Sequence, residues 1–289
     1  MKARDLKKLV FDKLVKNLTQ IVGFDVNYIL CPICTRDFHK LDNLTFGHII
    51  PESLGGRRRT LVCTECDNRL GHQAESHLKN FLLAEEGSLG LSFLQGSLEI
   101  SGVRINQATK WDVKKGGTTE FSVGKNNDPK KIELFQEKLR NNPDKIELKL
   151  RLNYNPIRVK IAHIKIGYLA CFDEIGYRYV LSENTKLIRE QLLHPSRHNK
   201  DLELLSLTNN NCDHDFKGRY SIKPISIPNS GISTPMYLVS YALKNQINKI
   251  YSVAMPPLAI SFEDYIERLR NIRKIDKTFQ ISILESNLK

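Results

Sequence analysis

Two pairs of cysteines with the spacing C-x-x-C lie early in this chain, Cys31 with Cys34 and Cys63 with Cys66. A C-x-x-C pair places two sulfurs on one side of a tight turn, and two such pairs complete a tetrahedron of thiolates around Zn²⁺. Zinc with four thiolate ligands has no open coordination position, so it holds a fold together and does not bind substrate. The spacing therefore predicts a structural zinc site that stabilises a unit too small to have its own core.

The segment between the two cysteine pairs is longer than the roughly 15–20 residues of a simple zinc ribbon. It contains the run TFGHIIPESLGGRRRT at 45–60, and His48 lies at its centre. Hydrolysis of a phosphodiester needs an activated water and a counter-charge for the extra negative charge at phosphorus, which a divalent cation supplies. A histidine can take the proton from the water, because its unperturbed pKa lies near working pH.

Together these residues resemble the motif of the HNH endonucleases, also called ββα-metal or His-Me finger nucleases. The likeness is to a zinc-containing branch with the pattern E/D-H-I-I-P-x-x-L-G-G followed by V-C-x-x-C-N-x-x-L-G. In this chain the pattern reads G-H-I-I-P at 47–51, L-G-G at 54–56 and V-C-T-E-C-D-N-R-L-G at 62–71. The resemblance covers about a fifth of the chain. It implies a zinc-bound, treble-clef-like ββα-metal unit within an α+β protein.

The resemblance also implies roles for two residues. His48 corresponds to the general base that takes a proton from water. Asp67, directly after the last zinc cysteine, corresponds to a ligand of the catalytic divalent ion, Mg²⁺ or Mn²⁺. A carboxylate suits that role because hard cations prefer oxygen ligands.

One position departs from the family pattern. The family has a second carboxylate immediately before the histidine, where this chain has Gly47. A site with a single carboxylate is weaker and depends more on bound nucleic acid, because Mg²⁺ keeps several waters and uses substrate phosphates as ligands. Glu52 and Glu75 are candidates for the missing charge. Glu75 follows Asp67 by two helical turns, and for Glu75 we favour an ordinary solvated helix residue.

Four arginines near the predicted hairpin suit contact with phosphate, because a guanidinium matches phosphate geometry. A solvated basic loop is the alternative. The net charge of +12 and the isoelectric point of about 9.4 also suit a polyanionic partner. We therefore expect a nucleic acid, DNA in the first place and RNA as the alternative. The arginines are Arg57, Arg58, Arg59 and Arg69.

The remaining candidate ligands have less specific surroundings. Cys171 lies in the apolar run IGYLACF and is expected to be a buried thiol. Cys212 lies beside Asp213 and His214, where a polar loop is favoured over a second metal cluster. Two further histidines, His72 and His77, follow the second cysteine pair and are expected to be surface or packing residues, with contact to metal or substrate as the alternative.

Composition indicates a globular chain, with 40% hydrophobic and 26% charged residues among 289. This length suits one large or two modest domains. The N-terminal residues contain scattered basic side chains and no apolar signal-peptide core, and no run reaches the roughly 18 apolar residues of a membrane span. We therefore expect a cytoplasmic protein that binds no membrane, where paired cysteines bind zinc in place of forming disulfides.

Hydrophobic periodicity predicts the elements that position these residues. Apolar residues recur on one face over 4–22, which predicts an amphipathic helix ended by Gly23. Its lysines are expected to be solvated, with contact to phosphate as the alternative. The polar residues 105–130 predict a long loop or ragged hairpin. Further helices are expected at 66–87, 130–141, 157–174, 184–193 and 262–274, and strands at 44–46, 90–104 and 145–154 and within 202–260.

These elements suggest three parts: an N-terminal helix at 1–26, a zinc-containing nuclease domain at 27–90, and a mixed α/β region at 91–289 that positions substrate or senses a signal. The leading hypothesis is a metal-dependent HNH endonuclease acting on DNA, by analogy one of restriction or phage defence. One alternative is a zinc-stabilised nucleic-acid-binding protein that has lost cleavage, as Gly47 suggests. Another is a zinc-scaffolded protein-interaction module.

Overall fold

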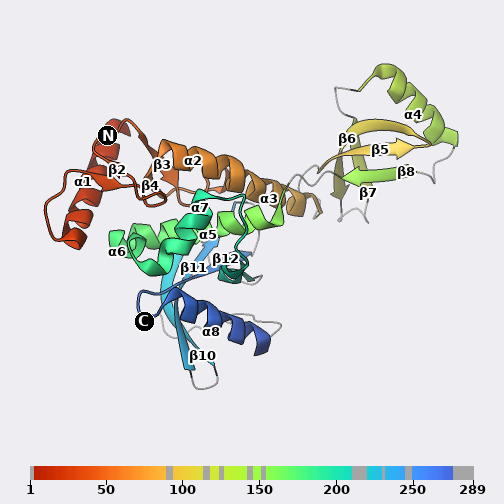
Figure 1. Cartoon of the computed structure of the whole chain (residues 1–289). Coiled ribbons are helices and arrows are strands. Elements are labelled where there is room, and N and C mark those ends of the chain that lie inside the picture. The colour runs from red at the N-terminus through yellow and green to blue at the C-terminus, as the bar shows by residue number, and fades with distance from the viewer. Residues whose placement is uncertain are drawn as a thin grey trace, which may run out of the picture. The chain divides into compact units, whose positions relative to one another are not determined.

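The computed structural model describes residues 3–88, 94–112, 118–123, 127–141, 146–150, 154–209, 220–229, 232–244 and 249–275. Figure 1 shows helices combined with small sheets, and every pair of neighbouring strands is antiparallel, so the predicted α+β class is confirmed. Contacts divide the chain into unit 1, residues 1–75 and 157–289, and unit 2, residues 76–156. This division differs from the predicted boundary at residue 90. The functional division of the chain stays a prediction.

Unit 1 begins with the predicted amphipathic helix, α1 (Ala3–Val22). Its apolar face buries Phe11, Leu14 and Leu18, because these residues recur at helical spacing. The helix ends at Gly23, whose φ of +81° is accessible to glycine without strain and whose N–H donates to the Thr19 carbonyl at 3.0 Å.

The zinc-knuckle region contains two short hairpins and a helix. Strands β1 (Ile29–Leu30) and β2 (Asp37–Phe38) form the first hairpin. Strands β3 (Leu44–His48) and β4 (Arg59–Cys63) form the second, and α2 (Thr64–Leu70) follows at once. A short 3₁₀ turn, Glu52–Leu54, lies between β3 and β4. A π-helical turn, Gly71–Glu75, extends α2 to the end of the first segment of unit 1.

The centre of unit 1 is the apolar helix α5 (Pro156–Ile175), which was predicted almost to its bounds. It packs on a sheet with the strand order β10-β11-β12-β9 (Figure 1). The approach is close at Gly167, where an added Cβ would lie 2.8 Å from the Met255 sulfur and 3.0 Å from Val253. A glycine here lets the helix backbone approach strand β12. The strands are β9 (Ser206–Asn209), β10 (Tyr220–Asn229), β11 (Ile232–Ala242) and β12 (Ile250–Met255).

Besides the sheet, α5 also contacts the zinc-knuckle region. The Tyr168 hydroxyl donates to the Pro32 carbonyl at 2.5 Å. Tyr177, in the following α6 (Tyr177–Val180), donates to the Leu30 carbonyl at 2.6 Å and accepts from the Leu30 N–H at 3.0 Å. Because a strand of only two residues leaves backbone groups unpaired, these tyrosines complete the hydrogen bonding of the first hairpin.

The last helices of unit 1 lie near their predicted positions. Helix α7 (Lys186–Leu193) follows a 3₁₀ turn at Glu183–Thr185. Helix α8 (Phe262–Ile275) begins after Ser261, whose hydroxyl caps it by accepting from the Asp264 N–H at 3.1 Å.

Strand structure was expected from residue 202 onward but begins only at Ser206. Residues Lys200–Leu205 form a 3₁₀ helix instead, because Leu202 and Leu205 are three residues apart and both are buried, a spacing that suits a 3₁₀ turn. The cluster at Cys212, Asp213 and His214 lies outside the described residues.

Unit 2 begins with α3 (Ser76–Ser88) and contains a sheet with the order β7-β6-β5-β8. Its helix α4 (Pro129–Asn141) packs Phe135 against Leu98, Ile100 and Ile105 of the sheet. Of the two structures expected for 105–130, a long loop or a ragged hairpin, the hairpin is confirmed, because β6 and β7 pair antiparallel through polar sequence. The strands are β5 (Leu94–Ile100), β6 (Val103–Asp112), β7 (Thr118–Val123) and β8 (Ile146–Leu150).

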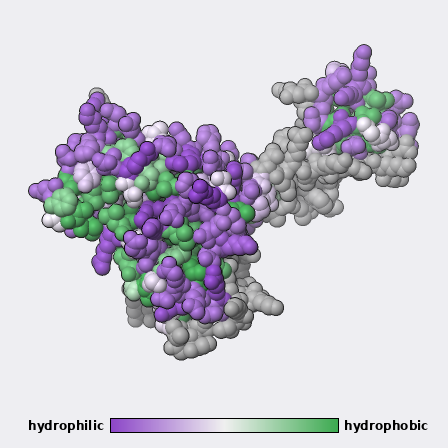
Figure 2. Space-filling model, in the orientation of Figure 1, coloured by the Kyte–Doolittle hydropathy of each residue, from purple (hydrophilic) through white to green (hydrophobic). Residues whose placement is uncertain are grey.

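The surface is largely hydrophilic on the face that Figure 2 shows, with apolar residues visible between the polar ones. Among the described helices, none combines the length and the apolar character that crossing a membrane requires.

The hydrogen bonds of Tyr177 predict a difference between two buried tyrosines. Tyr177→Phe should lower the free energy of unfolding by about 1–3 kcal/mol, because both backbone groups of Leu30 lose their partner. Tyr265→Phe is the matched control, since the buried Tyr265 hydroxyl contacts no partner among the described residues. Urea unfolding measures both variants, and equal midpoints would contradict the role given to Tyr177.

Candidate active site

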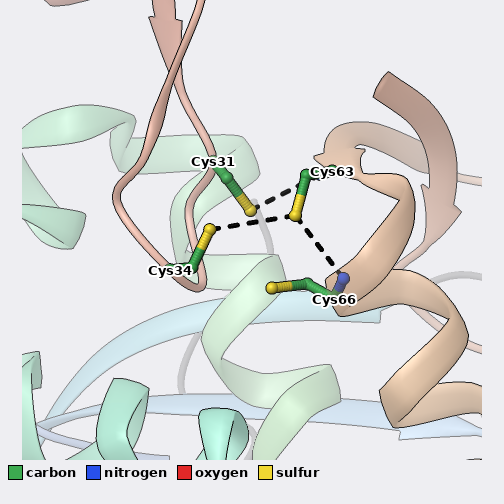
Figure 3. Close-up of side chains that lie close together, drawn as sticks. All are labelled: Cys31, Cys34, Cys63 and Cys66. Atoms are coloured by element: carbon green, nitrogen blue, oxygen red, sulfur yellow. Dashed lines mark hydrogen bonds between the residues drawn. The ribbon is translucent and has the colours of Figure 1, made fainter. Parts of the chain in front are cut away.

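The four cysteines of the two C-x-x-C pairs converge on one point (Figure 3). Cys31 and Cys34 lie in the turn between β1 and β2, Cys63 ends β4, and Cys66 lies in α2. Their sulfurs all lie within 4.8 Å of one another, and those of Cys34 and Cys63 are 3.8 Å apart. A zinc tetrahedron with bonds of about 2.3 Å has edges of roughly 3.8 Å. The arrangement therefore fits the predicted structural zinc ion.

Two arginines surround the thiolates. Arg36 donates to the Cys34 sulfur at 3.4 Å, and Arg69 donates to the Cys66 sulfur at 3.5 Å. Glu65 pairs with both guanidinium groups. Zinc bound by four thiolates has two net negative charges, so two arginines compensate that charge.

Arg69 is therefore used inside the fold. It also donates to the carbonyl of Leu193, the last residue of α7, at 3.2 Å. Its predicted contact with phosphate gains no support from this geometry.

A cleft of about 340 Å³ lies beside the zinc site. His48, the last residue of β3, and Asp67, in α2, both line it, because the hairpin passes directly into the helix. The structure thus brings together the two residues to which the sequence assigned chemistry. The complete lining is His48, Pro51, Glu52, Ser53, Asp67, Asn68, Gly71, His72 and Glu75.

His48 is held in a form that can accept a proton. Its side chain is 22% exposed, and burial is the main cause that lowers its pKa below the usual value. Glu52 opposes this shift from 3.9 Å, measured between its Oε2 and the histidine Nε2. The neutral imidazole is the form that a general base requires.

Asp67 is a half-buried carboxylate without a partner. Within the part of the chain that the structure describes, no hydrogen-bond donor or cation contacts its side chain, and burial raises its pKa above the usual value. Glu75 raises this pKa further, whereas Lys165 and His48 lower it. A buried charge normally has a partner. The carboxylate thus fits a site for a cation.

Packing closes the position where the family has its second carboxylate. A Cβ at Gly47 would lie 2.6 Å from Val62 Cγ2 and 3.1 Å from Asp67 Oδ1. The first distance is shorter than real contacts allow, so a side chain at residue 47 requires Val62 to move. The second distance shows that residue 47 faces the Asp67 carboxylate directly.

Glu75 is not the solvated helix residue that we expected. It lines the cleft at the end of the π-helical turn, and its Oε1 lies 2.6 Å from Lys165 Nζ. Lys165 also donates to the His48 carbonyl. Sequence reasoning missed Lys165, although a single lysine in the apolar run IAHIKIGYLACF was a usable signal.

The arginines 57–59 differ in their surroundings. Arg58 is paired with Asp173 at 3.0 Å and Glu174 at 2.6 Å, and it contacts Tyr220. Arg57 and Arg59 are exposed, and Arg59 lies opposite His48 across the hairpin.

His72 and His77, the two further histidines noted in the sequence, belong to different units. His72 lines the cleft. His77 belongs to unit 2, where its Nδ1 accepts from the Asn155 N–H at 3.1 Å.

Comparison with known proteins gives one match. Residues 31–83 match a family model described as HNH endonuclease. No curated protein and no solved structure matches the chain. The matched segment begins at the first zinc cysteine and contains the β3–β4 hairpin, α2 and part of α3, so the resemblance drawn from the motif is confirmed over these residues. Such a domain points to nuclease chemistry and implies a nucleic acid as partner.

The closed position at residue 47 predicts a loss of stability on substitution. Gly47→Ala should lower the free energy of unfolding by about 1–3 kcal/mol, because its Cβ overpacks against Val62. Gly71→Ala is the matched control, since its Cβ would meet nothing within 4 Å. The control should be neutral or stabilising by up to about 1 kcal/mol. Urea unfolding of the zinc-loaded proteins compares them, and an unaffected Gly47→Ala would show that the position is open.

The arginines at the thiolates predict an effect on zinc affinity. Arg36→Met should weaken zinc binding by about 10–100-fold, because it removes a donor to Cys34 and a positive charge near the metal. Arg57→Met is the control, since Arg57 is exposed and is not one of the arginines that donate to the cysteine sulfurs. Competition with a chromogenic zinc chelator measures both affinities, and equal values would refute the compensation of charge.

Proposed function

We propose that this protein is a metal-dependent endonuclease that hydrolyses phosphodiester bonds of DNA. One observation carries the proposal. A neutral, partly buried imidazole, His48, and a partly buried carboxylate without a partner, Asp67, line one cleft beside the four-thiolate site. Both belong to the segment that matches the HNH endonuclease family.

In this proposal His48 is the general base. Its imidazole takes a proton from the water that attacks phosphorus, which is favourable because burial keeps the ring neutral. The Glu52 carboxylate, 3.9 Å from Nε2, then stabilises the imidazolium that forms.

Asp67 would hold the catalytic divalent ion. When bound, Mg²⁺ or Mn²⁺ supplies positive charge for the phosphoryl oxygens and the leaving oxygen. Among the described residues, the cysteine cluster is the one group where three or more possible ligand atoms lie within 4.8 Å of one another. Waters and a substrate phosphate would therefore complete the coordination around Asp67, so that the ion binds weakly to the free protein.

DNA would reach this cleft along a basic surface. Arg57 and Arg59 are exposed, and Arg59 lies opposite His48 across the hairpin, whereas Arg58 is paired with two carboxylates. We therefore assign phosphate contact to Arg57 and Arg59. The net charge of +12 adds a general attraction for a polyanion. A role in restriction or phage defence remains part of the proposal by analogy alone.

The packing at Gly47 favours a second candidate function. A site that lacks one metal carboxylate, at a position where any side chain would displace Val62, also suits a protein that binds nucleic acid without cutting it. The two candidates differ in one outcome. Only the nuclease converts supercoiled plasmid to nicked or linear DNA, whereas both bind DNA with strong salt dependence.

The deciding experiment is cleavage of supercoiled plasmid, single-stranded DNA and RNA, with and without added Mg²⁺ or Mn²⁺, by protein that retains its zinc. His48→Ala should lower the cleavage rate by roughly 10²–10⁴-fold, because the water loses its base. Asp67→Asn should abolish cleavage, so that added Mg²⁺ or Mn²⁺ no longer has an effect.

His39→Ala is the control, since His39 is exposed and pairs with Asp37 outside the cleft. Binding without cleavage by the natural chain would favour the second candidate. A preference for RNA would correct the substrate.

A further inference from the structure

A charged side chain from outside the HNH segment reaches the proposed site. Lys165 lies in the middle of α5, where every side chain from Ile161 to Phe172 is buried, and its own side chain is 2% exposed. Burying an ammonium is costly unless it is paired and hydrogen-bonded. Both of its contacts, the Glu75 carboxylate and the His48 carbonyl, belong to residues that line the cleft.

The first contact fixes the backbone of the proposed base. His48 is the last residue of β3, where the chain leaves the hairpin, and its carbonyl accepts from the Lys165 ammonium. The next residue, Ile49, remains bonded to the hairpin through its N–H, which donates to the Arg58 carbonyl at 3.1 Å. Lys165, on α5, therefore holds the peptide group between His48 and Ile49.

The second contact of Lys165 is an ion pair with the Glu75 carboxylate. Its Oε1 lies 2.6 Å from Lys165 Nζ, so this carboxylate already has a cation. Asp67, in the same cleft, has none among the described residues. The pairing thus distinguishes two neighbouring carboxylates, one compensated by the protein and one available to an added ion.

Stability alone is a poor explanation for this arrangement. Replacing a buried ion pair by apolar side chains of similar volume is often neutral or stabilising. The neighbours of Lys165 along α5 are apolar, so such a replacement would suit the helix.

We propose that Lys165 is a positioning residue of the proposed active site, and this inference rests on the proposed function. Its ammonium holds the His48 carbonyl and keeps Glu75 from acting as a second ligand of the divalent ion. The catalytic unit is then completed by α5, far along the chain from the HNH segment.

Three variants test this assignment. Lys165→Met removes the ammonium, and the double variant Lys165→Met/Glu75→Gln removes both charges of the pair. Lys160→Met is the matched control on the same helix, since Lys160 pairs with Glu203 and lines no part of the cleft. The measurements are kcat and KM for DNA cleavage, the urea midpoint, and Mn²⁺ binding to the substrate-free, zinc-loaded protein by electron paramagnetic resonance.

Lys165→Met should lower kcat by about 100-fold with KM changed little, because the base is no longer held in place. It should also bind Mn²⁺ about tenfold more tightly, since Glu75 becomes available next to Asp67. The double variant should regain the natural urea midpoint and Mn²⁺ affinity but keep the low kcat. Lys160→Met should leave kcat and Mn²⁺ affinity unchanged.

A double variant with natural kcat would overturn the proposal, because Lys165 would then only compensate a buried charge. Natural kcat in Lys165→Met would overturn it as well. If Lys165→Met does not fold, the kcat of the double variant decides alone: a natural value overturns the proposal, and a low value supports it. If the natural chain does not cut DNA, the proposed function fails separately, and unchanged Mn²⁺ affinity in Lys165→Met would then overturn the inference by itself.

Discussion

Four thiolates at one point are the constraint on which the rest of unit 1 depends. Four negative sulfurs within 4.8 Å of one another repel unless a cation binds them. A zinc ion would supply two of the required charges, and Arg36 and Arg69 supply the other two, with Glu65 paired to both guanidinium groups. The cluster joins the first hairpin, the end of β4 and the start of α2. It thereby connects the hairpin and the helix whose residues His48 and Asp67 line the cleft.

Helix α5 is the second element on which the cleft depends. It is buried between the C-terminal sheet and the zinc-knuckle region, and it reaches that region through Tyr168 and Lys165. The knuckle has too few apolar residues for a core of its own, so it uses the core of unit 1. This explains why the compact unit combines residues 1–75 with residues 157–289 and does not end near residue 90.

The charges in the cleft follow from this packing. A carboxylate in place of Gly47 would require Val62 to move, because the Val62 side chain lies in front of this position. Glu75 is compensated by Lys165, and Asp67 remains without a cation among the described residues. The cleft therefore contains one carboxylate without a cation among the described residues and one internal ion pair. Binding of a divalent ion and binding of substrate are therefore expected to depend on each other.

By itself, the sequence determined the features that depend on local spacing: the two C-x-x-C pairs, the ββα order around His48 and Asp67, and the helices with a clear apolar period. Local spacing left a loop and a hairpin open at 105–130, and it misled where leucines three apart form a 3₁₀ turn. Only the tertiary structure decided the partners of individual charges. Arg58 and Arg69 lie within the basic motif but are paired with other groups of the protein, and Lys165 enters the site from a distant helix. Such pairings depend on contacts between segments far apart in the chain, and no local pattern contains them.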